Sequence, residues 1–143
     1  MQQVLVTGGN GLLGYETLRQ LSATGHYVVY AYQRSLPEEP LPGVHYLSGE
    51  LGSANWQQNL PDKMDVIIHL AQSNHFRNFP EQALDIFGVN SKATIDLLDY
   101  AVKAGTKKFI YTSTGGVYTG GQSPFHEKDA LCFENQAGFY AAT

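Results

Sequence analysis

Short apolar runs alternate along the chain with segments that have helical spacing. Each run is continuous rather than interrupted at every second residue, which is typical of parallel strands that helices cover on both faces. The pattern therefore predicts five buried strands. They are Val4–Val6, Tyr27–Ala31, Val44–Leu47, Val66–Leu70 and Phe109–Tyr111.

Two segments between these runs show the apolar spacing of a helix. One follows the opening strand and carries Leu13, Leu18 and Leu21. The other runs from Pro80 to Gly105, and proline at the start with glycine at the end suits a long helix. Strands and helices in this order predict an α/β fold with a doubly wound parallel sheet, in which the crossover connections are right-handed.

Two other connections are expected to lack a long helix. Residues 34–43 hold three prolines and a glycine, which predicts a loop between the second and third strands. Residues Gly115 to Asn135 are rich in glycine and directly follow the end of the fifth strand. Ligands of open α/β sheets bind at the carboxyl ends of the strands, so this second irregular region is expected near a binding site.

The strongest local signal is a run of glycines between the first strand and the first helix. Gly8, Gly11 and Gly14 are spaced three apart, and a helix start with free N–H groups follows them. Such a turn lets the backbone approach a pyrophosphate, which the positive end of the helix attracts. A plain glycine-rich turn is the less favoured alternative. A nucleoside triphosphatase loop is excluded because Tyr15 and Glu16 stand where that loop needs lysine.

Composition narrows the classes further. The 143 residues are 43% hydrophobic and 15% charged with a net charge of -4, which indicates one folded domain rather than a disordered chain. No basic stripe or apolar stretch of membrane-spanning length is present, so neither nucleic acid nor membrane is an expected partner. The single cysteine, Cys132, and the absence of a signal peptide predict a soluble, cytoplasmic protein. Five scattered histidines predict no metal site.

Five motifs follow one another along the whole chain. They are Thr7–Gly14, Gly49–Leu51, Val66–Ala71, Asn90 with Ala93 and Thr94, and Phe109–Tyr118. In this order they resemble the motifs of the extended short-chain dehydrogenase/reductases, including the NAD-dependent epimerase/dehydratases of nucleotide-sugar metabolism. The resemblance implies that residues 1–143 are the amino-terminal part of a dinucleotide-binding domain. Its sheet would be a Rossmann-type sheet that is incomplete at the carboxyl end, and the substrate domain would be absent.

The resemblance also implies a nicotinamide cofactor, either NADP or NAD. In the family, the segment matching Gly49–Leu51 meets the adenine, and the end of the strand matching Val66–Ala71 passes beside the riboses. The cofactor-binding residues that the resemblance implies are Gly8, Asn10, Gly11, Leu12, Leu13, Gly14, Gln33, Arg34, Glu50, Leu51, Leu70, Ala71 and Asn90.

The end of the second strand favours NADP over NAD. An acidic residue there would bind the ribose 2′-hydroxyl of NAD, whereas an arginine accommodates the 2′-phosphate of NADP. This chain has Gln33 and Arg34 followed by Ser35, with no acid. The alternative is that Arg34 is an ordinary solvated surface charge.

Two hydroxyl residues match the family's catalytic positions. Thr114 matches the serine or threonine at the end of the fifth strand, with Ser113 as the alternative if the register differs by one. Tyr140 matches the tyrosine of the family's Tyr-x-x-x-Lys pair. A phenol has an ordinary pKa of about 10, so it needs nearby positive charge to act as a base at neutral pH. In the family, the lysine and the oxidised nicotinamide supply that charge.

The sequence stops at Thr143, one residue before the position of that lysine. We therefore expect the chain to be part of a longer protein and to have little or no turnover alone. The parent protein is expected to be an NAD(P)-dependent epimerase, dehydratase or reductase that acts on a hydroxyl or keto carbon, plausibly of a nucleotide sugar. The alternative is a non-catalytic NAD(P)-binding sensor. Family members often dimerise through helices that match Pro80–Ala104 and one opening at Tyr140, so the parent is expected to be a homodimer.

Overall fold

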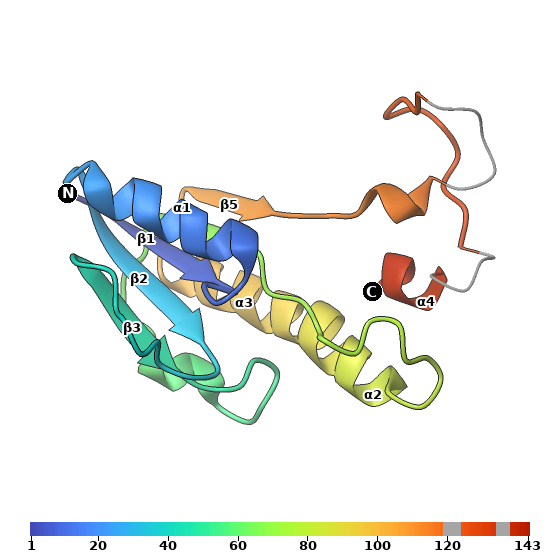
Figure 1. Ribbon diagram of the computed structural model, residues 1–143, viewed down its shortest axis with the longest axis horizontal. Helices are drawn as coiled ribbons and strands as arrows, with labels where there is room; N and C mark the ends of the chain where they lie inside the picture. The colour runs from blue at the N-terminus through green and yellow to red at the C-terminus, as the bar shows by residue number, and fades with distance from the viewer. Residues whose placement is uncertain (119–123, 134–137) are drawn as a thin grey trace.

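The computed structural model describes residues 1–118, 124–133 and 138–143, and it contains one parallel sheet (Figure 1). The predicted α/β class and the five predicted strands are confirmed. The strands lie in the order β3-β2-β1-β4-β5. Their bounds are Gln2–Thr7 for β1, Tyr27–Gln33 for β2, Val44–Ser48 for β3, Val66–His69 for β4 and Lys108–Tyr111 for β5.

The register brings the carboxyl ends of the central strands to one level. Thr7 at the end of β1 pairs with Tyr32 of β2 on one side and with His69 of β4 on the other. His69 in turn pairs with Tyr111 at the end of β5. Because parallel strands all point one way, the loops that follow these residues gather at the same edge of the sheet.

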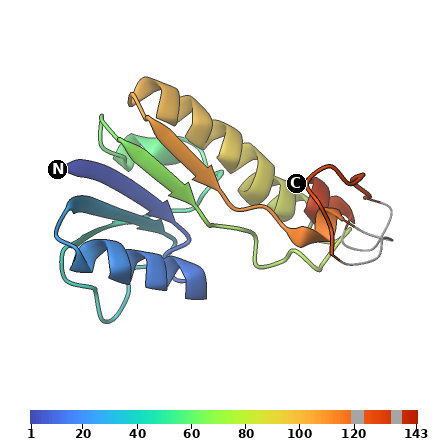
Figure 2. The same cartoon turned by 90° about the horizontal axis from the view of Figure 1, so that it is seen from above.

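Helices cover both faces of the sheet (Figure 2). Helix α1 (Leu12–Ala23) lies on one face, where Leu18 packs with Val6 and Val29. Helix α3 (Ala93–Lys103) lies on the other face, where Leu97 packs with Ile67. Apolar side chains therefore leave each central strand in both directions, which explains why the strands read as continuous apolar runs.

The predicted long helix begins three residues later than expected and is not regular throughout. It comprises α2 (Ala83–Ile86), a π-helical segment η2 (Phe87–Lys92) and α3. Pro80 has no N–H, and its carbonyl accepts a turn hydrogen bond from the N–H of Ala83 at 3.1 Å instead of opening the helix. The end is as predicted, because Gly105 has the positive φ of 71° that favours glycine after a helix.

Two short 3-10 helices were not predicted, and the helix expected to open at Tyr140 begins two residues earlier. The 3-10 helix η1 (Trp56–Asn59) follows β3 and buries Trp56 against Tyr32, with ring centroids 5.1 Å apart. A second 3-10 turn, η3 (Gly115–Val117), lies inside the region expected to be irregular, and α4 (Gly138–Ala142) follows it. Residues 119–123 and 134–135 of that predicted region lie outside the described residues.

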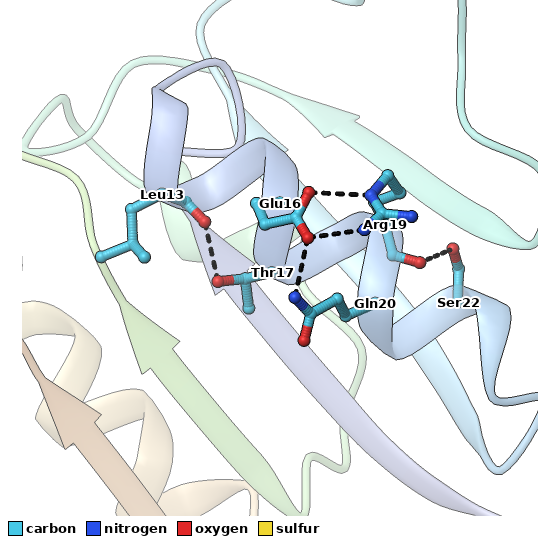
Figure 3. A network of polar contacts seen from close by, with 6 residues as sticks. All are labelled: Leu13, Glu16, Thr17, Arg19, Gln20 and Ser22. Atoms are coloured by element: carbon cyan, nitrogen blue, oxygen red, sulfur yellow. Dashed lines mark hydrogen bonds and ion pairs between the residues drawn. The ribbon is translucent and has the colours of Figure 1, made fainter.

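Polar side chains of α1 form a network of hydrogen bonds and an ion pair within that helix (Figure 3). The Glu16 carboxylate accepts hydrogen bonds from Arg19 at 2.6 and 2.8 Å and from the Gln20 amide at 2.7 Å. These hydrogen bonds lower the pKa of Glu16 to about 2, with Arg19 contributing most. Since i,i+3 and i,i+4 neighbours face each other on a helix, the contacts favour the helical backbone that follows the glycine turn. Within the described residues, we find no helix that is long and apolar enough to cross a bilayer.

Replacing Ile67 by valine is expected to lower the free energy of unfolding by about 0.5–1.5 kcal/mol. The side chain is fully buried in the central strand β4, so removal of one methyl group leaves a small cavity. Ile110→Val is the matched control, because Ile110 is 41% exposed on the edge strand β5 and its change should cost much less. Urea unfolding of both variants measures the difference, and equal losses would contradict this packing of the sheet.

Candidate functional site

A cavity of about 500 Å³ opens at the carboxyl ends of the strands. All the predicted cofactor residues except Asn90 lie in its wall. Its lining consists of Gly8, Asn10, Gly11, Leu12, Leu13, Gly14, Tyr32, Gln33, Arg34, Gly49, Glu50, Leu51, Leu70, Ala71, Gln72, Ser73, Asn74, Asp85, Val89, Thr112 and Ser113. The fold thus brings residues from several separate loops to one concave site, which is where open α/β sheets bind ligands.

The glycine turn forms the floor of this cavity with little room for side chains. Gly8 has φ of 75°, and its carbonyl accepts a hydrogen bond from the N–H of Gly11 at 3.0 Å. A Cβ on Gly14 would lie 2.1 Å from the Gly8 oxygen, and a Cβ on Gly8 would lie 2.8 Å from the Ala71 nitrogen. The turn therefore lets α1, β1 and the end of β4 approach closely.

The amino end of α1 is open toward the cavity. Gly11 is the N-cap residue, so this helix end has no capping side-chain hydrogen bond, and its first turn has no acidic residue. Free N–H groups and the positive end of the helix dipole therefore remain for an anion. Such an end fits a pyrophosphate group.

Polar groups gather where β2 ends. The side-chain amide of Gln33 donates to the Ser35 carbonyl at 2.9 Å, and the Asn10 amide donates to the Ser35 hydroxyl at 3.4 Å. Arg34 is exposed and lines the cavity, while Gln33 is buried. Asn10 and Arg34 thus line the part of the cavity where the ribose 2′ position is expected from the resemblance, and Ser35 contacts Asn10.

Glu50 and Leu51 lie on the cavity wall after β3. Gly49 before them packs against the hydroxyl of Tyr32, where a Cβ would lie only 2.1 Å from the phenol oxygen. Glu50 is exposed, so its carboxylate is free to meet a polar edge of a ligand. The geometry suits an adenine-binding wall. Tyr32 also lines this wall, and no local sequence pattern indicates that position.

His69 lies at the centre of a buried hydrogen-bond network. Its Nδ1 is 2.6 Å from the Thr7 hydroxyl and its Nε2 is 3.0 Å from the Thr94 hydroxyl. The Thr7 hydroxyl accepts from the N–H of Ala71 at 3.3 Å, and Thr94 donates to the Asn90 carbonyl at 2.5 Å. Each hydroxyl has one proton, so Thr7 donates to Nδ1 and Nε2–H donates to Thr94.

This arrangement requires neutral His69. A proton on Nδ1 would face a Thr7 oxygen that already accepts from Ala71, and the Thr7 proton would lose its acceptor. Burial lowers the pKa of His69 to about 4, which also favours the neutral form of the ring. No local pattern in the sequence indicates this polar role of His69, because it depends on the pairing of β1 with β4.

Asn90 lies in the π-helical segment and is 5% exposed. Its side-chain oxygen accepts from the N–H of Ser73 at 2.8 Å, and its amide donates to the Thr143 hydroxyl at 3.4 Å. Asn90 therefore forms hydrogen bonds to two neighbouring segments from a buried position. Asn90 nevertheless lines a second, smaller cavity rather than the large one.

The second cavity has a volume of about 80 Å³ and adjoins the first. Both predicted catalytic residues, Thr114 and Tyr140, lie in its wall. Ser113, the alternative to Thr114, lies in the walls of both cavities. The residues that the two cavities share are Leu70, Ala71, Gln72, Thr112 and Ser113.

Tyr140 and Thr114 approach one another from α4 and from the turn after β5. The Tyr140 hydroxyl donates to the side-chain oxygen of Gln72 at 2.5 Å, and the Thr114 hydroxyl accepts from the N–H of Gly116 at 3.1 Å. Burial raises the pKa of Tyr140 and the phenol of Tyr111 adds to this rise, while a hydrogen bond with Thr114 opposes it. Tyr140 is therefore a neutral phenol in this environment at physiological pH.

Sequence reasoning missed Gln72, Ser73 and Asp85, all of which line the large cavity. Ser73 is buried, and its hydroxyl donates to the Asp85 carboxylate. Gln72 and Ser73 follow the end of β4, so the rule that ligands bind at strand ends would have found them. No local pattern distinguishes Asp85, which reaches the cavity from α2. The described residues contain no group of three metal-ligating side chains placed to hold an ion.

Comparison with known proteins agrees with this geometry. Residues 4–143 match the sequence profile of the family described as NAD dependent epimerase/dehydratase family. The chain belongs to the NAD-dependent epimerase/dehydratase family. The expected resemblance is thus confirmed across the glycine turn, the strands and the segment that contains Tyr140.

Two relatives illustrate the extent of the match within the epimerase/dehydratase family. A UDP-N-acetyl-alpha-D-glucosaminuronate decarboxylase of Bacillus cytotoxicus is 29% identical, over 90% of this chain and 41% of its own length. A UDP-glucose 4-epimerase of Klebsiella pneumoniae is 32% identical, over 81% of this chain and 91% of its own length. Most of the curated relatives are longer, and the chain spans roughly 34–41% of the first five.

Solved structures share the fold. MoeE5 in complex with UDP-glucose and NAD is 27% identical and superposes with a TM-score of 0.81, over 98% of this chain and 46% of that protein. A short-chain dehydrogenase/reductase superfamily protein from Agrobacterium tumefaciens with bound NAD has a TM-score of 0.84 at 24% identity, over 99% of this chain and 42% of that protein. The Rossmann-type sheet is therefore confirmed.

Proposed function

We propose that residues 1–143 form the amino-terminal, cofactor-binding part of an NADP-dependent oxidoreductase that acts at a hydroxyl or keto carbon of a nucleotide sugar. The observation that carries the proposal is the junction of the two cavities. The large one is built around the glycine turn and the open end of α1, and the small one holds Thr114 and Tyr140. A nicotinamide cofactor supplies hydride acceptance or donation when it is bound.

Three groups of residues would bind three parts of the cofactor. The N–H groups at the start of α1 would hold the pyrophosphate, as the open helix end allows. Glu50 and Leu51 would face the adenine. Leu70 and Ala71 would lie beside the riboses, since both border the passage from the large cavity to the small one.

We assign proton transfer to the residues of the small cavity. Tyr140 would exchange a proton with the substrate oxygen, and the hydroxyl of Thr114 would orient that oxygen. Asn90 would hold the cavity wall through Ser73 and Thr143 rather than touch the reacting atoms. We therefore assign Asn90 a positioning role.

The preference for NADP is supported by the end of β2. Arg34 is free to form charge-assisted hydrogen bonds with a 2′-phosphate, and Ser35 and Asn10 lie beside it as further polar partners. No carboxylate stands at this position to bind a 2′-hydroxyl or to repel the phosphate. MoeE5 and the Agrobacterium protein are described with NAD, so on this point the chain is proposed to differ from them.

The nucleotide-sugar substrate is supported by the names of the relatives, which include a UDP-glucose 4-epimerase and a UDP-sugar acid decarboxylase. A second candidate is a non-sugar substrate. A 3 beta-hydroxysteroid dehydrogenase/Delta 5-->4-isomerase of Mycobacterium tuberculosis is 32% identical over 85% of this chain and 34% of its own length. A screen of UDP-sugars and hydroxysteroids with the full-length protein and both cofactors distinguishes the two candidates.

Replacing Arg34 by glutamine is expected to weaken NADP binding about tenfold and to leave NAD binding nearly unchanged. The change removes one charge-assisted contact to the 2′-phosphate, which only NADP carries. Isothermal titration calorimetry with each cofactor measures the effect. Arg77→Gln is the matched control, because Arg77 is exposed and lines neither cavity. Equal weakening of both cofactors, or no binding of either, would contradict the proposal.

We further propose that the full-length protein is a cytoplasmic homodimer. The surface formed by α2, η2 and α3 carries a stripe of exposed apolar side chains at helical spacing, and buried apolar stripes are typical of homodimer interfaces. Helix α4, which opens at Gly138 rather than at Tyr140, would add to this surface. Size-exclusion chromatography of the full-length protein tests the dimer. The stripe consists of Leu84, Phe87, Ile95, Leu98 and Val102.

A further inference from the structure

Gln72 stands at the boundary between the two cavities. It is the third residue after the end of β4, and it lines both the large cavity and the small one. Its side chain is exposed, so packing does not dictate its identity. Its side-chain oxygen accepts the hydroxyl proton of Tyr140 at 2.5 Å, which is a short distance for a hydrogen bond between neutral groups.

The chemistry of this contact favours one protonation state of the phenol. A carboxamide oxygen can accept a hydrogen bond from a neutral phenol but has no proton to give to a phenolate. A hydrogen bond that only the neutral form can make stabilises that form. Among the described residues, the other groups that act on Tyr140 are the Phe76 ring, whose centroid lies 5.0 Å away, the hydroxyl of Thr114 and the titratable phenol of Tyr111.

None of these described groups brings a positive charge to Tyr140. Arg77 is directed to the ring of Phe76, at 4.9 Å from its centroid. Gln72 is thus the described residue that holds the phenol proton at the cavity boundary.

We propose that Gln72 is a positioning residue that holds Tyr140 as a neutral phenol with its proton at the boundary of the two cavities, ready for donation to a substrate oxygen. The role of Tyr140 as a proton carrier rests on the proposed function. The contact of Gln72 with Tyr140 and its effect on the phenol pKa do not rest on the proposed function. An experiment can therefore contradict this proposal without contradicting the proposed function, and the reverse. Loss of cofactor binding would contradict the proposed function, whereas the test below uses the protein without any cofactor.

The test follows the ionisation of Tyr140 by NMR in protein labelled with ¹³C at the tyrosine Cζ. The Tyr140 signal is assigned by its loss in Tyr140→Phe. Gln72→Met keeps the length of the side chain but removes the acceptor. It is expected to move the titration midpoint of Tyr140 to lower pH by about 0.5 to 1 unit, a three- to tenfold change in the acid dissociation constant.

Gln72→Glu gives the opposite expectation. A carboxylate in the same place both accepts the phenol proton and repels the phenolate, so the midpoint should move to higher pH. Gln58→Met is the matched control, because Gln58 is exposed and lines neither cavity, and it should leave the Tyr140 midpoint unchanged.

Two results would overturn the proposal. An unchanged midpoint in both Gln72 variants would mean that the side chain does not hold the phenol in solution. A midpoint that moves to higher pH in Gln72→Met would mean that the amide N–H of Gln72 stabilises the phenolate instead. Because Gln72 is exposed, neither variant removes a buried side chain, and circular dichroism verifies that both are folded.

Discussion

Replacing Gly14 by alanine is expected to weaken dinucleotide binding about 100-fold or more and to destabilise the fold by about 1–3 kcal/mol. The new Cβ would lie 2.1 Å from the carbonyl oxygen of Gly8, so α1 has to move away from the turn. That movement takes the N–H groups at the start of α1 out of line with the pyrophosphate. Each hydrogen bond to a charged group contributes about 1.5–3 kcal/mol, so loss of one or two accounts for the factor.

Gly88→Ala is the matched control for this change. Gly88 also lies in a helical segment, but a Cβ there would meet no atom within 4 Å. Alanine should therefore be neutral or should stabilise the protein by up to about 1 kcal/mol. Calorimetric titration with NADP and urea unfolding measure both variants. Normal binding by Gly14→Ala would show that the glycine turn does not hold the cofactor.

Acidification from pH 6.5 to pH 4 is expected to remove about 3 kcal/mol of the free energy of unfolding through His69. Its pKa is lowered from 6.5 to about 4 by burial. The unfolded chain therefore takes up a proton below about pH 6.5, while the folded protein takes it up only below about pH 4. Stability from this group is complete above pH 6.5 and falls as the pH decreases through this range.

Comparison with His69→Gln isolates this contribution from that of the carboxylates. Glutamine does not titrate and can still donate an amide N–H toward Thr94, so the variant should lose the His69 part of the pH dependence. His26→Gln is the control, since His26 is exposed to solvent and lies outside the buried network. Urea unfolding at pH 4 to 8 gives the profiles. Parallel profiles for the protein and His69→Gln would contradict the neutral, buried network.

The parts of the fold that depend on local sequence patterns could be predicted from the sequence. Continuous apolar runs identified the strands, and the glycine spacing placed Gly8 and Gly11 in the turn before α1 and Gly14 in the first turn of that helix. The helix from residue 80 was predicted in kind but not in detail, because hydrophobic spacing does not reveal that Phe87–Lys92 is a π-helical segment.

The parts of the site that depend on tertiary contact could not be predicted. The polar role of His69 needs the pairing of β1 with β4, which places Thr7 opposite it. The contact of Gln72 with Tyr140 joins residues 68 positions apart. Asp85 lines the cavity and contacts Ser73 in the segment after β4, and no spacing in the sequence encodes that contact. Strand ends thus predict where a site lies better than which side chains complete it.

The wall common to the two cavities has a consequence for how substitutions combine. Residues 70–72 and 112–113 separate the two spaces without closing either. A substitution in this common wall disturbs both cavities at once. Its effects on cofactor affinity and on the ionisation of Tyr140 should therefore be non-additive with those of a second substitution in either cavity. Substitutions at the far rims, at Arg34 and at Thr143, touch no common neighbour and should combine independently.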